Sequence, residues 1–107
     1  MVKLCFYVPV DAAEHVKAAV FASGAGTIGN YESCCWQVEG QGQFKPLAGA
    51  QPAIGQVDQL ETVAEVKIEM VCTDRQIKTA VKALIAAHPY EEPAYHFWQV
   101  QTLDDLA

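Results

Sequence analysis

Four segments of alternating apolar and polar residues, separated by two helical stretches, constrain the fold of this chain most strongly. Segments 2–8, 31–39, 64–72 and 95–101 alternate with a period of two, as strands with one face in a core do. The order strand, helix, strand, strand, helix, strand predicts a ferredoxin-like α+β sandwich. Because crossover connections are right-handed, we expect both helices on one face of a four-stranded antiparallel sheet.

Both helical stretches carry boundary signals. Asp11, followed by Glu14 three residues later, predicts a capping box for the first helix. That helix is expected to end at Gly24. Asp74 is the expected cap of the second helix, and Pro89 ends it because proline excludes the preceding residue from the helical region.

Composition excludes several classes of partner. The 107 residues are expected to form one domain spanning 1–107, and their formal net charge of −6 argues against nucleic acid and anionic membranes. The opening apolar run is too short to cross a membrane, so a cytoplasmic location is the expectation. The cysteines lack CxxC spacing and are interpreted as reduced structural thiols; they are Cys5, Cys34, Cys35 and Cys72.

The face of the sheet away from the helices is expected to carry Cys5, Tyr7 and Cys35. The last strand has large side chains on both of its faces, with His96 and Trp98 alternating with other aromatic residues. A sheet face that is partly aromatic is usually covered by another subunit. The pattern therefore predicts self-association.

Segment 88–95, which reads His-Pro-Tyr-Glu-Glu-Pro-Ala-Tyr, is the richest candidate site. Two prolines stiffen it, so Tyr90, Glu91 and Glu92 are candidate ligand-binding residues held by the body of the protein. His88, Glu91, Glu92 and His96 are candidate ligands of a divalent metal, since they offer nitrogen and oxygen donors. In the structural alternative His88 ends the helix as an imidazolium and the glutamates remain solvated.

Segment 24–29 matches the spacing GxGxxG. It follows a helix and precedes a strand, which is the wrong context for a dinucleotide site. Two alternatives remain: a tight turn that needs positive φ, or a nest of backbone N–H groups that binds an anion. We expect Glu91 or Glu92 to accept hydrogen bonds from the backbone of 24–31. The candidate ligand-binding residues here are Gly24, Gly26, Gly29 and Tyr31.

Segment 40–60 has no clear periodicity, and its apolar residues gather at 44–47. Loops of this length in a compact domain are either functional or disordered. The apolar island predicts a short paired piece inside an ordered loop. A protein partner that binds through loop 40–60 is therefore one expectation.

Three stretches carry a family resemblance: 24–34, then 40–46 with 49–55, and finally 88–95. Together they resemble the domain inserted in the middle of NGG-interacting-factor-three-like proteins of the YqfO type. The resemblance covers nearly the whole chain. In that family the insert is similar to CutA and the PII signalling proteins, which are ferredoxin-like and trimeric. The resemblance thus implies a homo-oligomer, with a trimer expected first and a dimer second.

The resemblance also limits the expected function. The family carries a dinuclear metal centre with a His-His pair in a flanking domain, whereas this chain has only His15, His88 and His96. We interpret the chain as a standalone insert domain, not an enzyme, with no catalytic residues and no cofactor. The expected function is a non-catalytic oligomeric module that binds a small ligand or a protein. The alternative is a CutA-like protein that binds a divalent metal through 88–96.

Overall fold

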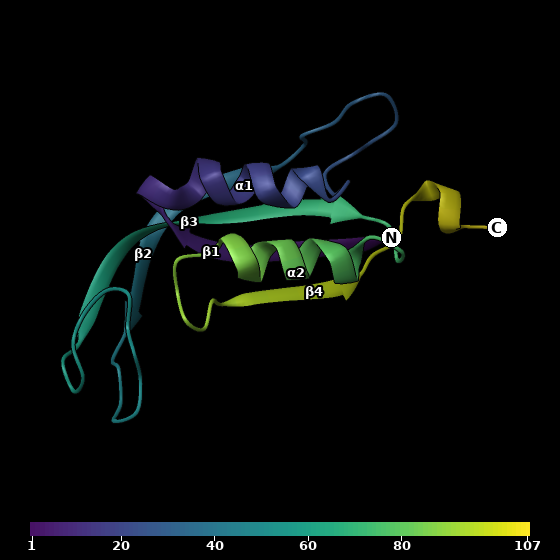
Figure 1. Ribbon diagram of the computed structural model, residues 1–107. Helices are drawn as coiled ribbons and strands as arrows, with labels where there is room; N and C mark the ends of the chain where they lie inside the picture. The colour runs from purple at the N-terminus through teal and green to yellow at the C-terminus, as the bar shows by residue number, and fades with distance from the viewer.

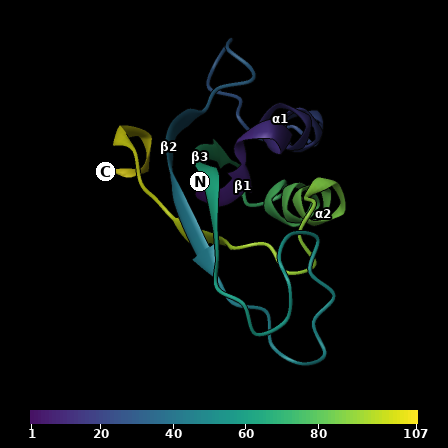
Figure 2. The same ribbon diagram turned by 90° about the vertical axis from the view of Figure 1, so that its left-hand side faces the viewer.

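The computed structural model describes residues 1–107 and contains one antiparallel sheet with strand order β2-β3-β1-β4. Both helices cover the same face of the sheet (Figures 1 and 2). The predicted ferredoxin-like α+β fold is confirmed. The elements are β1 (Val2–Pro9), a 3-10 turn (Val10–Ala12), α1 (Ala13–Ala22), β2 (Trp36–Phe44), β3 (Glu61–Cys72), α2 (Ile77–Ala87), β4 (Tyr95–Gln99) and a final 3-10 turn (Leu103–Asp105).

The core lies between the sheet and the two helices. Every second side chain of β1, and of β3 from Val66 onward, enters it, and Phe6 pairs with Ile68 in β3 and with Tyr95 in the edge strand β4. This is the packing that the alternating segments require. The fully buried side chains include Val2, Leu4, Phe6, Val8, Val16, Val20, Val66, Ile68, Ala80 and Leu84.

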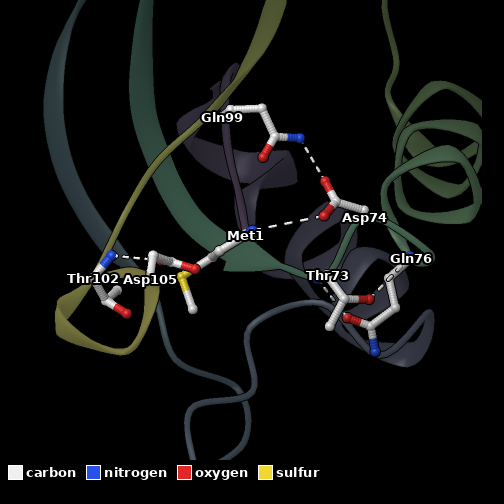
Figure 3. A network of polar contacts seen from close by, with 7 residues as sticks. All are labelled: Met1, Thr73, Asp74, Gln76, Gln99, Thr102 and Asp105. Carbon is white, nitrogen blue, oxygen red and sulfur yellow. Dashed lines mark hydrogen bonds and ion pairs between the residues drawn. The ribbon is translucent and has the colours of Figure 1, made fainter. Parts of the chain in front are cut away.

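The two predicted helix caps are wrong. Asp11 lies inside the 3-10 turn that follows β1, and α1 has no side-chain cap. Asp74 instead approaches the Met1 amino group at 3.7 Å and accepts a hydrogen bond from Gln99 (Figure 3). These two partners lie at the chain start, just before β1, and in β4, both distant from Asp74 in sequence.

Other residues provide the local turn chemistry expected of Asp74. The Thr73 hydroxyl accepts a hydrogen bond from the Gln76 N–H at 3.2 Å, and the Gln76 side chain accepts one from the Thr73 N–H at 3.0 Å. At the C-terminus, Thr102 and Asp105 form a capping box around the final 3-10 turn (Figure 3). The predicted acidic tail thus contains a short ordered turn.

The hairpin formed by β2 and β3 is longer than predicted. β2 begins at Trp36, not at residue 31, and continues through two glycines to Phe44. β3 begins at Glu61, where Phe44 pairs with it. Segment 31–35 is not part of the strand, because the chain folds back on itself there and the Cys34 N–H donates to the Gly26 carbonyl at 2.8 Å. The irregular connection shrinks to 45–60.

The two long loops lie at opposite ends of the molecule (Figure 1). Loop 23–35 is attached near the end of β3, since the Gly26 N–H donates to the Val71 carbonyl at 2.8 Å. Loop 45–60 lies at the other end, together with the α2–β4 turn (Figure 1). Neither helix has the length and apolar character that crossing a membrane requires.

Candidate functional site

The α2–β4 turn, residues 88–94, is anchored to the backbone of Tyr7 in β1. The ring of His88 is buried, and its Nε2 lies 2.7 Å from the Tyr7 carbonyl oxygen. Its Nδ1 accepts a hydrogen bond from the Tyr90 N–H at 3.0 Å. At the other end of the turn, the Ala94 carbonyl accepts from the Tyr7 N–H at 3.2 Å. The two prolines therefore bracket a turn that is tied down at both ends.

This geometry selects one form of the His88 ring. A carbonyl only accepts and a backbone N–H only donates, so Nε2 carries the proton and Nδ1 carries the lone pair. Burial lowers the pKa of His88, although the Tyr7 carbonyl and the charge of Glu65 act in the opposite direction. The expected imidazolium at the helix end is therefore wrong, and the buried ring is neutral.

Because of His88, the free energy of unfolding is expected to decrease as the pH is lowered. Its pKa in the unfolded chain is the ordinary 6.5, and the folded value is lower. The stabilisation is therefore complete above 6.5 and is lost as pH falls through the folded pKa, with a slope of at most about 1.4 kcal/mol per pH unit. Urea denaturation at several pH values between about 8 and 5 measures this slope.

The matched variants for this measurement are His88→Gln and His15→Gln. His15 is exposed on α1, so its variant should keep the wild-type slope. His88→Gln should flatten the pH dependence, whatever its effect on stability at neutral pH. The same slope in all three proteins would contradict the role given to His88.

Tyr90 connects the turn to β2 and β3. Its hydroxyl donates a hydrogen bond of 2.9 Å to Glu65 Oε2, and its ring packs edge-on against Phe44 with 5.7 Å between centroids. Burial, with the neighbouring Glu65 carboxylate, raises the pKa of Tyr90. The hydroxyl therefore stays protonated and acts as a donor to Glu65.

Gly42 leaves room for the Glu65 carboxylate. A Cβ atom at this position would overlap the Glu65 side-chain oxygens. The glycine in β2 thus lets the carboxylate lie across the neighbouring strand and reach Tyr90. Glycine usually weakens the interior of a strand, but here Gly42 allows the Glu65 carboxylate to approach the backbone of β2 closely.

The predicted neighbour of the two glutamates is wrong. Glu91 Oε1 accepts a hydrogen bond of 3.3 Å from the Gln51 N–H in loop 45–60, and Glu92 is exposed beside it. Segment 24–31, the expected partner, lies at the opposite end of the sheet (Figure 1). The turn is held by the body of the protein as expected, but its contacts are with β1, β2, β3 and loop 45–60.

These contacts border a cavity of about 260 Å³, open to solvent on one side, that we call the turn hollow. Its walls come from residues 43–46, 52–54 and 90–92, together with Tyr7, Ala50, Glu65 and Ala94. Half of the lining residues are hydrophobic, and the polar ones lie mainly on the side of the turn and β3. The predicted candidates Tyr90, Glu91 and Glu92 all line it.

The glycine-rich candidates belong to a different structure. Gly24, Gly26 and Gly29 all have positive φ, which supports the tight-turn alternative. Both backbone polar groups of Gly26 are bonded within the protein, so they are not available to an anion. Tyr31 is 74 % exposed and does not line the turn hollow.

The metal candidates do not converge. Both ring nitrogens of His88 are occupied by backbone partners. His96 lies on β4 opposite Cys5, on the face of the sheet away from the helices. No three or more His, Cys, Asp and Glu side chains in residues 1–107 form a group able to hold a metal ion.

The sheet face opposite the helices, here called the open face, has exposed aromatic side chains. The strand register places Trp36 and Trp98 on it, and they are 60 % and 44 % exposed. Cys5 and Tyr7 lie on this face as predicted. Cys35 does not, because it precedes β2. The final 3-10 turn lies on the same side of the sheet (Figure 2).

No protein-family model matches the chain. The chain is 48 % identical over 99 residues to a Bacillus subtilis protein named GTP cyclohydrolase 1 type 2 homolog, an alignment covering 92 % of this chain and 26 % of that protein. The protein of the same name from Mycobacterium tuberculosis is 50 % identical over 93 residues, covering 87 % and 24 %. The chain is a homologue of one segment of these proteins. It spans about a quarter of their length.

Solved structures agree with this relationship. A Bacillus cereus protein related to NIF3 superposes with a TM-score of 0.80 at 40 % identity, over 94 % of this chain and 26 % of that one. CutA from Xylella fastidiosa superposes with a TM-score of 0.66 at 21 % identity, over 94 % and 85 %. The second likeness concerns the fold alone. The predicted resemblance to a segment of NIF3-related proteins with a CutA-like fold is thus confirmed.

Proposed function

We propose that the chain is a non-catalytic, self-associating module that binds a small ligand in the turn hollow. The observation that supports this proposal is the hollow itself, where a rigid turn and loop 45–60 meet around an apolar wall with a few convergent polar groups. Concave sites of this composition are the usual form of small-molecule sites. Loop 45–60, which we expected to contact a protein partner, forms one of its walls.

A binding role suits the polar groups better than catalysis. His88 is neutral with both nitrogens bonded, and the raised pKa of Tyr90 opposes formation of a phenolate nucleophile. A general base needs a lone pair that reaches the substrate. His88 and Tyr90, whose pKa values are shifted, therefore hold the walls of the hollow in place.

No specific contact favours the divalent-metal alternative. The lone pair of its nitrogen donor His88 is engaged by the Tyr90 N–H, and its second nitrogen donor His96 lies on the open face. Of the four candidate ligands, only Glu91 and Glu92 line the turn hollow.

Filling the turn hollow tests the proposal. Ala50 is half-buried and lines the hollow, whereas Ala48 is exposed in the same loop and does not. In an amide NMR screen against a mixed library of small cations, neutral molecules and anions, hits should shift resonances around the hollow in the wild type and in Ala48→Phe. Ala50→Phe should abolish these shifts.

The proposal fails if the hits map elsewhere on the protein. It fails equally if Ala50→Phe, folded by its amide spectrum, retains every hit at the hollow with wild-type affinity.

A further inference from the structure

We infer that the turn hollow selects a small organic cation, a protonated amine carried on a short apolar body. This inference rests on the proposed function, since it names the ligand class of the same site. The cavity defines the site, and the charges around it determine which ligand it accepts.

The size of the turn hollow limits the ligand. Its volume of about 260 Å³ corresponds to about nine water molecules at ~30 Å³ each. Phe44 and Ile54, with small alanines and two prolines, provide an apolar wall for the body of the ligand. The fit is to a molecule with the dimensions of a single amino acid or a phenethylamine.

The hydrogen-bonding groups of the hollow are mostly acceptors. Tyr90 donates to Glu65 Oε2, and Oε1 of the same carboxylate, which lies against Gly42, has no hydrogen-bond partner within the protein. The Gln51 N–H is used by Glu91 Oε1, which likewise leaves Oε2. Glu92 adds a third carboxylate at the rim. The Tyr90 hydroxyl and the Gln51 N–H already donate within the protein, so a ligand that brings donors of its own matches the remaining carboxylate oxygens.

The charge balance points in the same direction. Three glutamates line the hollow against one cationic side chain, Lys45, which leaves a formal net charge of −2 around it. A carboxylate or phosphate ligand would enter a negative field, whereas an ammonium group would be attracted. The rings of Phe44 and Tyr90, which also line the hollow, favour a cation further through their π faces.

The position of the cation follows from the most rigid carboxylate. Glu65 is held by Tyr90 and lies in the space that Gly42 leaves open. Its side chain does not have to reorganise when a ligand arrives, unlike the exposed Glu92. We therefore place the ammonium group against Glu65, with the apolar body pointing toward Ile54 in the loop.

Three probes of matched size separate charge from shape: phenethylammonium, 2-phenylethanol and phenylacetate. Titrated into the full chain and followed by amide NMR, phenethylammonium should shift resonances of 50–54 and 90–92 at the lowest concentration. The alcohol should shift these resonances only at higher concentration, and phenylacetate should produce no shift there. Raising the salt concentration should weaken the binding of phenethylammonium but not that of the alcohol, because salt screens the attraction between the ammonium group and the carboxylates.

Substitutions identify the carboxylate that carries the effect. Glu65→Gln should weaken phenethylammonium binding about tenfold or more, as expected for loss of a hydrogen bond to a charged group. Glu92→Gln, at an exposed position that cannot disturb the fold, should weaken it several-fold. Glu32→Gln removes the same charge from loop 23–35 at the opposite end and should leave binding unchanged.

Equal binding of the three probes in the hollow would overturn the inference but leave the proposed ligand site intact. Preference for phenylacetate would do the same. Phenethylammonium binding that neither Glu65→Gln nor Glu92→Gln weakens would also overturn it. Loss of every hit at the hollow from the mixed library would instead remove the proposed function itself.

Discussion

His88→Ala is expected to lower the free energy of unfolding by about 2–5 kcal/mol, the largest stability effect we expect outside the apolar core. The variant removes a buried ring together with both of its hydrogen bonds. The Tyr7 carbonyl and the Tyr90 N–H lose their partners, and each buried unpaired group costs about 1–3 kcal/mol. The α2–β4 turn then loses one of its two attachments to β1.

Urea denaturation at neutral pH and one fixed protein concentration measures this change, since self-association makes stability depend on concentration. His15→Ala, at an exposed position on α1, is the matched control and should alter the free energy of unfolding by less than about 0.5 kcal/mol. If His88→Ala were as stable as His15→Ala, the turn would not be anchored through the ring.

Trp36→Glu combined with Trp98→Glu is expected to convert the proposed oligomer to a monomer. Both indoles are exposed on the open face, and large exposed aromatic patches mark protein contact surfaces. Each copy would bring two additional carboxylates to a contact between chains that already have a formal net charge of −6. The loss of apolar contact and the added repulsion act together.

Sedimentation velocity at tens of micromolar protein measures the association. The matched control is Ile28→Glu with Leu47→Glu, which changes two exposed apolar residues in the loops away from the open face. The wild type and this control should sediment as the same oligomer, a trimer first and a dimer second. A monomeric wild type would contradict self-association, and equal dissociation of both double variants would contradict the open face as its location.

The fold was predictable because its determinants are local. In β1 and β3 the period-two alternation places core residues such as Phe6 and Ile68 on one face, and the structure keeps this in β1 and from Val66 to Cys72, whereas Ala64 in the first half of β3 is exposed. The limits of β2 were not predictable from alternation, since Gly40 and Gly42 interrupt the apolar pattern while the backbone continues to pair with β3. Strand pairing is made by hydrogen bonds between backbone groups, so an apolar side-chain pattern cannot indicate how far the pairing extends.

The site was predictable only in part, because its contacts are long-range. The bracketing prolines indicated a rigid turn, and the structure attaches that turn firmly. Its partners are far away in sequence: Tyr7 lies 81 residues before His88, and Glu65 lies 25 residues before Tyr90. Choosing between the two glycine-rich loops as the neighbour of Glu91 required knowing at which end of the sheet each loop lies.

The incorrect helix-cap predictions have the same cause, because they too depend on contacts between residues that are distant in sequence. Asp74 has the sequence position of a cap, yet it lies near the Met1 amino group and Gln99. A distant charge competes with a local backbone donor, and only the tertiary structure places that charge. Thr73 and Gln76 form the reciprocal pair instead, with the spacing that a capping box has.

A crystal structure of the protein soaked with small fragments, among them phenethylammonium, 2-phenylethanol and phenylacetate, tests the central claim most directly. We expect fragment density in the turn hollow, between Phe44 and Ile54 on one side and Glu65 and Tyr90 on the other. Loop 45–60 should keep its bond from the Gln51 N–H to Glu91. A hollow closed by its own side chains, with every fragment bound elsewhere, would contradict the assignment of this cavity as the binding site.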